Sequence, residues 1–297
     1  MNGYHGVSTN IKALRISALL ILIYFVFEIA IALSTGSLSL LADAGHELST
    51  FVAIAISLLA MQLATQKPTP KKTFGLLRIE ILAALFNGLL LLGMAGFIII
   101  RGIDRLQNPM EVSSLPMFIM AFGGIGLEIA SLWIMYKGQK ESLNIRGSFW
   151  HVMNAFLGSV AVIIAAAFIQ FGQIYVADAW AGILFAFILI WASFGIIKDS
   201  FFILIDVAPK EVNLISIEKE LSKIPGVKKV HHFHARTLVG SIKTFSGHLV
   251  VKDMNQAGGI LKKAKQILDK KHGFSLSTVQ IEDENLSEAD IKQLEYK

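Results

Sequence analysis

Cysteine is absent from the 297 residues of this chain, and charged residues are scarce. Without cysteine, the protein has neither disulfide bonds nor thiolate metal sites. A transition-metal site must therefore use His, Asp, Glu, Asn or backbone oxygen atoms. Charged residues make up 16% of the chain and hydrophobic residues 54%, whereas an ordinary soluble domain carries about 25% charge. This composition indicates a membrane protein.

Motifs of the common enzyme classes are also absent. The chain has no Walker motif, no zinc-protease helix and no Ser-His-Asp arrangement. We therefore expect a protein that is not an enzyme and that requires no cofactor. The net charge is +5, but much of the basic excess flanks apolar segments, as the positive-inside rule expects. The expected partner surface is a lipid membrane and not nucleic acid.

Six apolar stretches are long enough to cross a bilayer core, which takes about 20 helical residues. They occupy residues 14–34, 38–64, 79–100, 115–136, 148–172 and 178–204. From about Asp206 onward, Lys and Glu become frequent. The sequence thus predicts an integral, multi-pass membrane protein. Its transmembrane domain covers residues 1–206, and a cytosolic domain covers residues 207–297.

Lys and Arg are concentrated on one side of the predicted spans. They lie in the N-terminal tail and in the loops after the second and fourth spans: Lys12, Arg15, Lys67, Lys71, Lys72, Arg78, Lys137, Lys140 and Arg146. The loops at 34–37 and 170–177 carry no Lys or Arg. The positive-inside rule therefore predicts that both termini are cytoplasmic.

The last 90 or so residues read as a small α+β domain of ferredoxin-like type. A helix should end at Ile224, before Pro225 and Gly226. Two strands around a turn at Gly240, a basic helix and a third strand then follow: 227–239, 242–251, 258–271 and 274–281. Ser287 and Asp290 form a capping box for a short last helix.

Ionisable residues within the spans cost about 2.5–3.5 kcal/mol each on insertion scales, and they point to function. The second span holds Asp43, His46 and Glu47, and the fifth holds His151 followed by Asn154. Glu28, Glu80 and Glu128 lie in the first, third and fourth spans. Helical spacing puts Asp43, His46 and Thr50 on one face, while Glu47 lies about 100° away from His46.

Two spans that each present an imidazole can give two nitrogen ligands to one zinc-like ion. Because histidine titrates near neutral pH, such a site can also exchange the metal for protons. The alternative for either histidine alone is a hydrogen bond to a neighbouring helix. Two histidines on matching faces, one of them beside Asp43, favour a metal site.

The C-terminal domain carries a second group of histidines: His231, His232, His234, His248 and His272. On a regular strand, His232 and His234 share a face. We expect His232, His234 and His248 to be the ligands of a regulatory zinc ion, if one binds. The alternative is a solvated strand edge without metal.

Several segments resemble the cation diffusion facilitator family, and in particular its bacterial cobalt, zinc and cadmium efflux transporters. They are SLSLLADAGHEL (37–48), RIEILAALFNG (78–88), RLQNPMEV (105–112), NIRGSFWHVMNAFLGSV (144–160), IPGVKKVHHFH (224–234) and TVQIEDE (278–284). The resemblance implies a homodimer that exports zinc or a related divalent ion in exchange for protons. It also implies that the cytosolic domain dimerises and binds regulatory metal. The compact chain favours a bacterial inner membrane.

The resemblance also implies a transport site in which a His is followed four residues later by Asp, on both the second and fifth spans. His46 and His151 match this pattern, but the two Asp positions hold Thr50 and Ala155. The candidate ligands are therefore the two histidines together with Asp43, Asn154 or Thr50. The alternative function is a transport-weak regulatory subunit or heterodimer partner of the same family. We expect Asp at positions 50 and 155 to strengthen zinc binding and to raise flux at low metal. The alternative is a site tuned for another ion, in which Asp43 or Glu47 supplies the charge and added Asp brings no gain.

Overall fold

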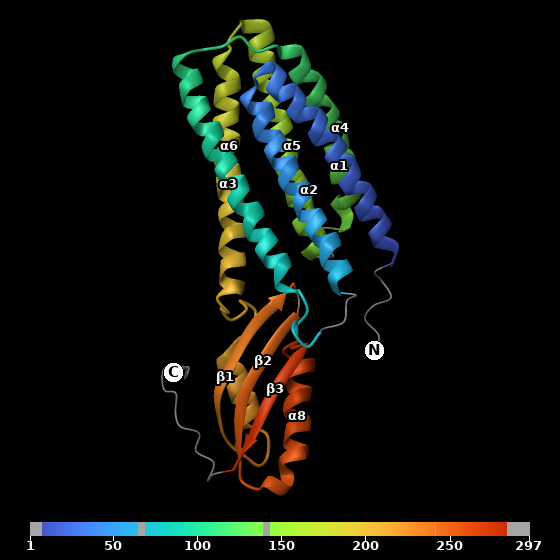
Figure 1. The fold of residues 1–297 in the computed structure, drawn as a ribbon, viewed down its shortest axis with the longest axis vertical. Coiled ribbons are helices and arrows are strands. Elements are labelled where there is room, and N and C mark those ends of the chain that lie inside the picture. Colours follow the sequence, from blue (N-terminus) through green and yellow to red (C-terminus); the bar gives the residue numbers. More distant parts are fainter. Residues whose placement is uncertain (1–7, 65–68, 139–142, 241, 284–297) are drawn as a thin grey trace. The chain divides into compact units, whose positions relative to one another are not determined.

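The computed structural model describes residues 8–64, 69–138, 143–240 and 242–283 (Figure 1). The chain forms two compact units. One contains residues 1–66 and 83–198, and the other contains 67–82 and 199–297. The first is built from long apolar helices, and the second contains a small mixed sheet.

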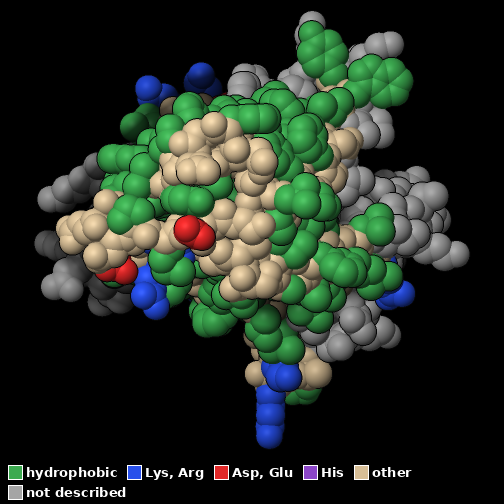
Figure 2. Space-filling model, turned by 90° about the horizontal axis from the view of Figure 1, so that it is seen from above, with side chains coloured by type: hydrophobic (Ala, Val, Ile, Leu, Met, Phe, Trp, Pro, Cys, Tyr) green, Lys and Arg blue, Asp and Glu red, His purple; other side chains and the backbone are tan. Residues whose placement is uncertain are grey.

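The predicted six-helix transmembrane domain is confirmed. Its helices are α1 (Ser8–Thr35), α2 (Leu38–Ala64), α3 (Arg78–Gln107), α4 (Ser114–Gly138), α5 (Leu143–Gly172) and α6 (Val176–Leu204). By length and composition, all but α4 contain a described stretch able to cross a membrane, and in α4 the described apolar stretch is Ser114–Gly126. Large apolar side chains such as Trp133 and Phe171 are more than four-fifths exposed, as a lipid-facing surface requires. Hydrophobic side chains surround the end of the helices seen in Figure 2.

Two apolar clusters hold the helices together. In the first, α1, α2, α4 and α5 pack around residues that include Ala32, Leu40, Met117 and Val162. In the second, α2 packs against α3 and α6, which lie side by side in Figure 1. The approach of α3 to α6 is close, because a Cβ atom on Gly102 would lie 2.5 Å from the Ile183 side chain. Small residues at such crossings are typical of membrane helices.

The start of α2 is fixed by a carboxylate that comes from α6. Asp178 is fully buried and accepts hydrogen bonds from the backbone N–H of Leu38 (2.6 Å) and of Ser39 (3.1 Å). The hydroxyls of Ser37 and Ser39 each donate to it at 2.6 Å, and Arg105 of α3 lies 3.5 Å away. An anion at a helix N-terminus satisfies the free N–H groups there. Asp178 therefore joins α6 to the start of α2, and its ion pair with Arg105 adds α3 to the same contact.

The second unit contains the predicted α+β domain, and the order α-β-β-α-β is confirmed. Its elements are α7 (Leu214–Ser222), β1 (Val227–Val239), β2 (Ile242–Val251), the short 3-10 helix η1 (Met254–Gln256), α8 (Ala257–Lys270) and β3 (Leu276–Glu282). The described sheet has three strands in the order β1-β2-β3, with β1 antiparallel and β3 parallel to β2. The helix predicted around Ser287 lies outside the described residues.

One face of this sheet is covered by α7 and α8 (Figure 1). Ile217 and Leu221 of α7, and Ile260, Ala264 and Leu268 of α8, pack against Val230, Phe233, Phe245 and Leu249 of the strands. The other face is left for polar side chains, as alternation along a strand requires. In the same unit, Asp206 accepts a hydrogen bond from Arg236 at 3.0 Å and forms an ion pair with Arg78. These contacts join β1 to the segments around residues 78 and 206 within the second unit.

Candidate metal centres

The membrane centre is built around His46 on α2. Asp43 and His46 are 2% and 6% exposed, so both polar groups are buried among the helices. The His46 ring lies 6.1 Å from the ring of Phe185. Thr50, one turn further along, donates its hydroxyl to the carbonyl of His46 at 3.1 Å. In this arrangement the threonine hydroxyl is directed to its own helix backbone.

Helix α5 approaches α2 at the level of Asp43. A Cβ atom on Gly158 would lie 2.8 Å from Asp43 Oδ1, and the Ser159 hydroxyl donates to Asp43 Oδ2 at 3.3 Å. Because the two helices run in opposite directions, this contact places His46 near the level of Ala155, and Thr50 near that of His151. The His position of each helix thus lies near the level of the Asp position of the other. The side chains of His151 and Asn154 lie outside the described residues.

Three glutamates join Asp43 at this depth. The same Ser159 hydroxyl lies 3.0 Å from Oε1 of Glu128 on α4, so Asp43 and Glu128 compete for its single proton. Glu28 of α1 is fully buried, and its carboxyl group interacts electrostatically with those of Asp43, Glu47 and Glu128. The sequence identified these glutamates as ionisable residues within spans, but it did not bring them together. Their similar depth in separate spans was the available signal.

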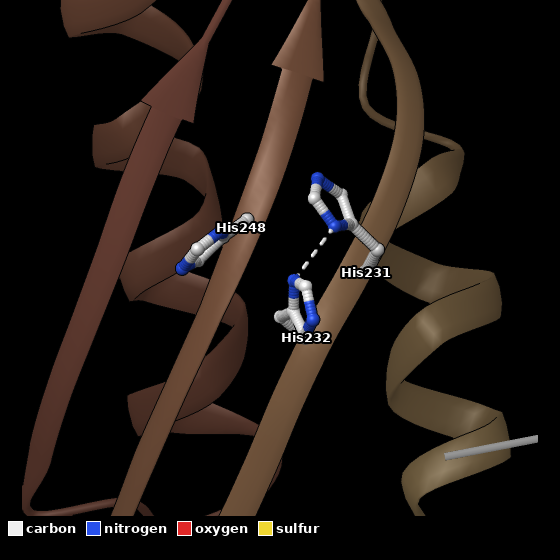
Figure 3. Close-up of side chains that lie close together, drawn as sticks. All are labelled: His231, His232 and His248. Carbon is white, nitrogen blue, oxygen red and sulfur yellow. Dashed lines mark hydrogen bonds between the residues drawn. The ribbon is translucent and has the colours of Figure 1, made fainter. Parts of the chain in front are cut away.

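The second centre lies on the sheet, where the structure gathers His231, His232 and His248 (Figure 3). One donor atom from each residue lies within 4.8 Å of the other two, and this is the sole such group of three among the described His, Asp and Glu residues. His231 and His232 come from β1 and His248 from β2. The ring centroids are 5.1 to 5.4 Å apart. All three side chains are half-buried.

A bulge in β1 explains why two adjacent histidines point the same way. The register jumps between His231, which pairs with His248, and His234, which pairs with Ser246. His232 occupies the extra position and has a φ of +48°, in the left-handed region. With regular strand alternation, the His232 and His234 side chains would share one face of the sheet, and the His231 side chain would lie on the other. Instead His232 joins His231, while His234 lies two β2 residues beyond His248 and outside the group.

The carboxylate of Glu282 on β3 lies against two of the three rings, with a hydrogen bond to His231 and an ion-pair distance to His248. It is 2% exposed, and one carboxylate oxygen lies 2.9 Å from His231 Nε2 while the other lies 2.7 Å from His248 Nδ1. Gln280 donates to the second oxygen at 2.9 Å. The sequence quoted Glu282 within its β3 motif but did not propose it as a site residue. The alternation Gln280, Glu282 along β3 was the signal.

The arrangement fits a zinc-type ion. Carboxylates commonly hold the outer nitrogen of a metal-binding histidine, so that the other nitrogen faces the metal. With Glu282 at His231 Nε2 and His248 Nδ1, the opposite nitrogens, Nδ1 and Nε2, are left to face the metal. His231 Nδ1 already lies 3.2 Å from His232 Nδ1. Ligand atoms on one tetrahedral zinc, each about 2.0–2.1 Å from the metal, have a similar separation.

Comparison with known proteins shows that two family models match most of this chain. Residues 14–205 match the family model described as the cation efflux transmembrane domain. Residues 209–284 match that of the cation efflux protein cytoplasmic domain. The chain belongs to the cation diffusion facilitator family. It is accordingly a multi-pass membrane transporter and not an enzyme, as the sequence predicted.

Relatives within the cation diffusion facilitators match nearly the whole chain. A "Cadmium, cobalt and zinc/H(+)-K(+) antiporter" of Bacillus subtilis is 34% identical over 289 residues, covering 96% of this chain and 93% of the relative. The "Metal cation efflux system protein CzcD" of Cupriavidus metallidurans is also 34% identical, with coverage of 96% and 90%. The "Zinc transporter ZitB" of Escherichia coli K12 is 31% identical, with coverage of 87% and 83%. The predicted role in metal cation efflux is confirmed at the level of the family.

Proposed function

We propose that this chain exports a divalent metal cation, with zinc, cobalt and cadmium as the leading candidates, from the cytoplasm in exchange for protons. The observation that carries the proposal is His46, an imidazole buried at membrane depth beside Asp43 on a helix that packs against α5. Imidazole nitrogen is a good ligand for these ions. Placing an ionisable side chain at this depth costs free energy, and such residues in membrane proteins usually serve function. The names of the bacterial relatives support the choice of ions.

Exchange follows from the chemistry of the imidazole. Neutral His46 can bind a metal, and protonated His46 cannot, so protons and metal compete for the same nitrogen. A rocking of the helices that exposes the site first to one side and then to the other would couple the two flows. His151 on α5 is the proposed second nitrogen ligand. Both termini face the cytoplasm of a bacterial inner membrane in this proposal, which agrees with the Lys and Arg distribution.

The assembly is a homodimer in this proposal, and the cytosolic histidines sense metal. Residues 207–297 should fold alone as a soluble dimer, since α7, α8 and the sheet share their own apolar core. His231, His232 and His248 would hold a regulatory zinc ion, oriented by Glu282. Zinc titration of the isolated domain followed by calorimetry tests this part. The absence of saturable heat would mean that these histidines do not bind zinc and are only polar residues on the strand surface.

Transport itself is tested by reconstituting the purified homodimer into vesicles with an acidic interior. Zinc, cobalt and cadmium are offered outside, and entry is followed with an interior metal dye. We expect entry of at least one ion, and loss of that entry when an ionophore collapses the pH gradient. No entry of any ion by the homodimer, followed by entry on mixing with a homologous subunit, would instead show a partner subunit.

A further inference from the structure

The buried carboxylates of the membrane unit form a cluster that no basic side chain offsets. Glu28, Asp43 and Glu128 are 0%, 2% and 9% exposed, and Glu47 interacts with the other three. Among the described residues, no Lys or Arg pairs with any of the four. Among the described side chains, Tyr24 on α1 also interacts with the four carboxyl groups, and the buried His46 lies one turn from Asp43 on α2. Negative charge at this depth needs a cation or protons to offset it.

Several oxygen atoms in this cluster have no hydrogen-bond partner. Within the described chain, no N–H or hydroxyl donor reaches either carboxyl oxygen of Glu28, Oδ1 of Asp43 or Oε2 of Glu128. The Glu28 and Asp43 carboxyl groups lie within hydrogen-bond reach of each other, and two carboxylates can share such a contact only through a proton or a cation. The Ser159 hydroxyl lies between Asp43 Oδ2 and Glu128 Oε1, and its single proton can be donated to only one of these oxygens at a time. Buried polar atoms in native proteins are nearly always paired, and an unpaired group calls for a ligand. These four oxygens thus form a set of possible ligand atoms contributed by three helices.

Two glycines allow the helices to pack closely around the carboxylates. A Cβ atom on Gly124 of α4 would lie 2.5 Å from the Tyr24 hydroxyl and 3.1 Å from Ser159 Oγ. A Cβ atom on Gly158 of α5 would lie 2.8 Å from Asp43 Oδ1. The absence of a side chain at Gly124 lets α4 approach α1 and α5 closely, and its absence at Gly158 lets α5 approach α2. The cluster is therefore built into the packing of the four helices.

We propose that Glu28, Asp43 and Glu128 form a divalent-cation position on the transport path, one turn from His46, that supplies the negative charge missing at Thr50 and Ala155. This rests on the proposed function. Two or three carboxylates match a +2 charge, and oxygen together with one imidazole suits zinc, cobalt or manganese-type ions. Oxygen atoms from all three carboxylates do not lie within 4.8 Å of one another, as the nitrogens of the sheet histidines do. Because Glu28 and Asp43 already lie close together, binding draws Glu128 toward this pair.

The test measures binding of zinc, cobalt and manganese, separately from transport, by calorimetry on the full-length protein in detergent. The background variant His231→Ala/His248→Ala removes the cytosolic cluster. Within it, Glu28→Gln and Glu128→Gln keep side-chain shape while removing the charge, and the amide oxygen introduced by Glu128→Gln can still accept from Ser159. Glu80→Gln is the matched control, because Glu80 lies near the start of α3, outside the cluster.

We expect each Gln variant to weaken binding of the preferred ion at least tenfold, with Glu80→Gln unchanged. If Glu28→Gln does not fold, Glu128→Gln decides. Binding equal to that of the background variant would overturn the proposal. Measurements of metal flux distinguish the carboxylate position from the proposed transport function. If the wild type transports metal and the Gln variants transport it equally well, the carboxylate position alone is refuted. A wild type that binds through these carboxylates but transports nothing refutes the proposed function alone.

Discussion

The Nδ1 atoms of His231 and His232 lie 3.2 Å apart, although the two residues are neighbours on one strand. The left-handed backbone of His232 makes this contact. Such a φ costs a residue with a Cβ atom about 1–2 kcal/mol, and costs glycine almost nothing.

His232→Gly should therefore leave the cytosolic unit more stable than His232→Ala does, by about 1 kcal/mol. Both variants remove the imidazole, so the difference between their free energies of unfolding reports the cost of the left-handed backbone at position 232. Chemical denaturation of the domain followed by circular dichroism measures it. His234→Gly and His234→Ala form the control pair, with the opposite order expected, because glycine weakens a regular strand. Equal stability of the two His232 variants would argue against the bulge.

Glu282→Gln should weaken zinc binding at the cytosolic cluster by about 10- to 100-fold, the usual effect of losing a carboxylate that orients a ligating histidine. The carboxylate lies within 2.9 Å of both His231 and His248, and an amide cannot accept from both rings. Calorimetry against Glu218→Gln, a glutamate of α7 distant from the cluster, provides the control. Unchanged affinity would mean that the rings are held by packing and not by Glu282.

Asp178→Ala should lower the stability of the membrane unit by about 3–5 kcal/mol, because a buried charged acceptor is removed and its donors are left behind. The donors are the first backbone N–H groups of α2, the Ser37 and Ser39 hydroxyls, and Arg105. Thermal unfolding in detergent should show an earlier transition than for Asp104→Ala, an exposed neighbour of Arg105. A transition unchanged from wild type would contradict the capping role.

Much of the fold follows from the sequence. The six apolar stretches and the two strands bounded by Pro225, Gly226 and Gly240 are found where hydropathy and turn residues put them. The bulge at His232 was not predictable, because its signal is a register jump between two strands. The carboxylate cluster was not predictable either. Periodicity shows which residues share a face of one helix, but it does not show which helices meet, and Glu28, Asp43 and Glu128 come from three of them.

Aspartate at positions 50 and 155 separates a weakened site from a rebuilt one. The sequence alone predicts a gain in zinc flux for Thr50→Asp/Ala155→Asp. With four carboxylates already at this depth, we instead expect no gain in the wild-type background, since more like charge beside them raises repulsion. In the Glu28→Gln/Glu128→Gln background, the same pair should restore flux, because it returns two negative charges to the faces of His46 and His151. A strong gain in wild type without rescue of the Gln variant would show that the natural protein is a weakened zinc site.

The most direct test of metal–proton exchange follows interior metal and interior pH together in the same vesicles, with wild type and His46→Ala side by side. The account predicts that metal entry into wild-type vesicles is accompanied by proton exit, seen as a rise in interior pH. His46→Ala should abolish both signals while keeping the wild-type unfolding temperature. Metal entry without a pH change, or full activity in His46→Ala, would contradict the exchange of metal and protons at this buried imidazole.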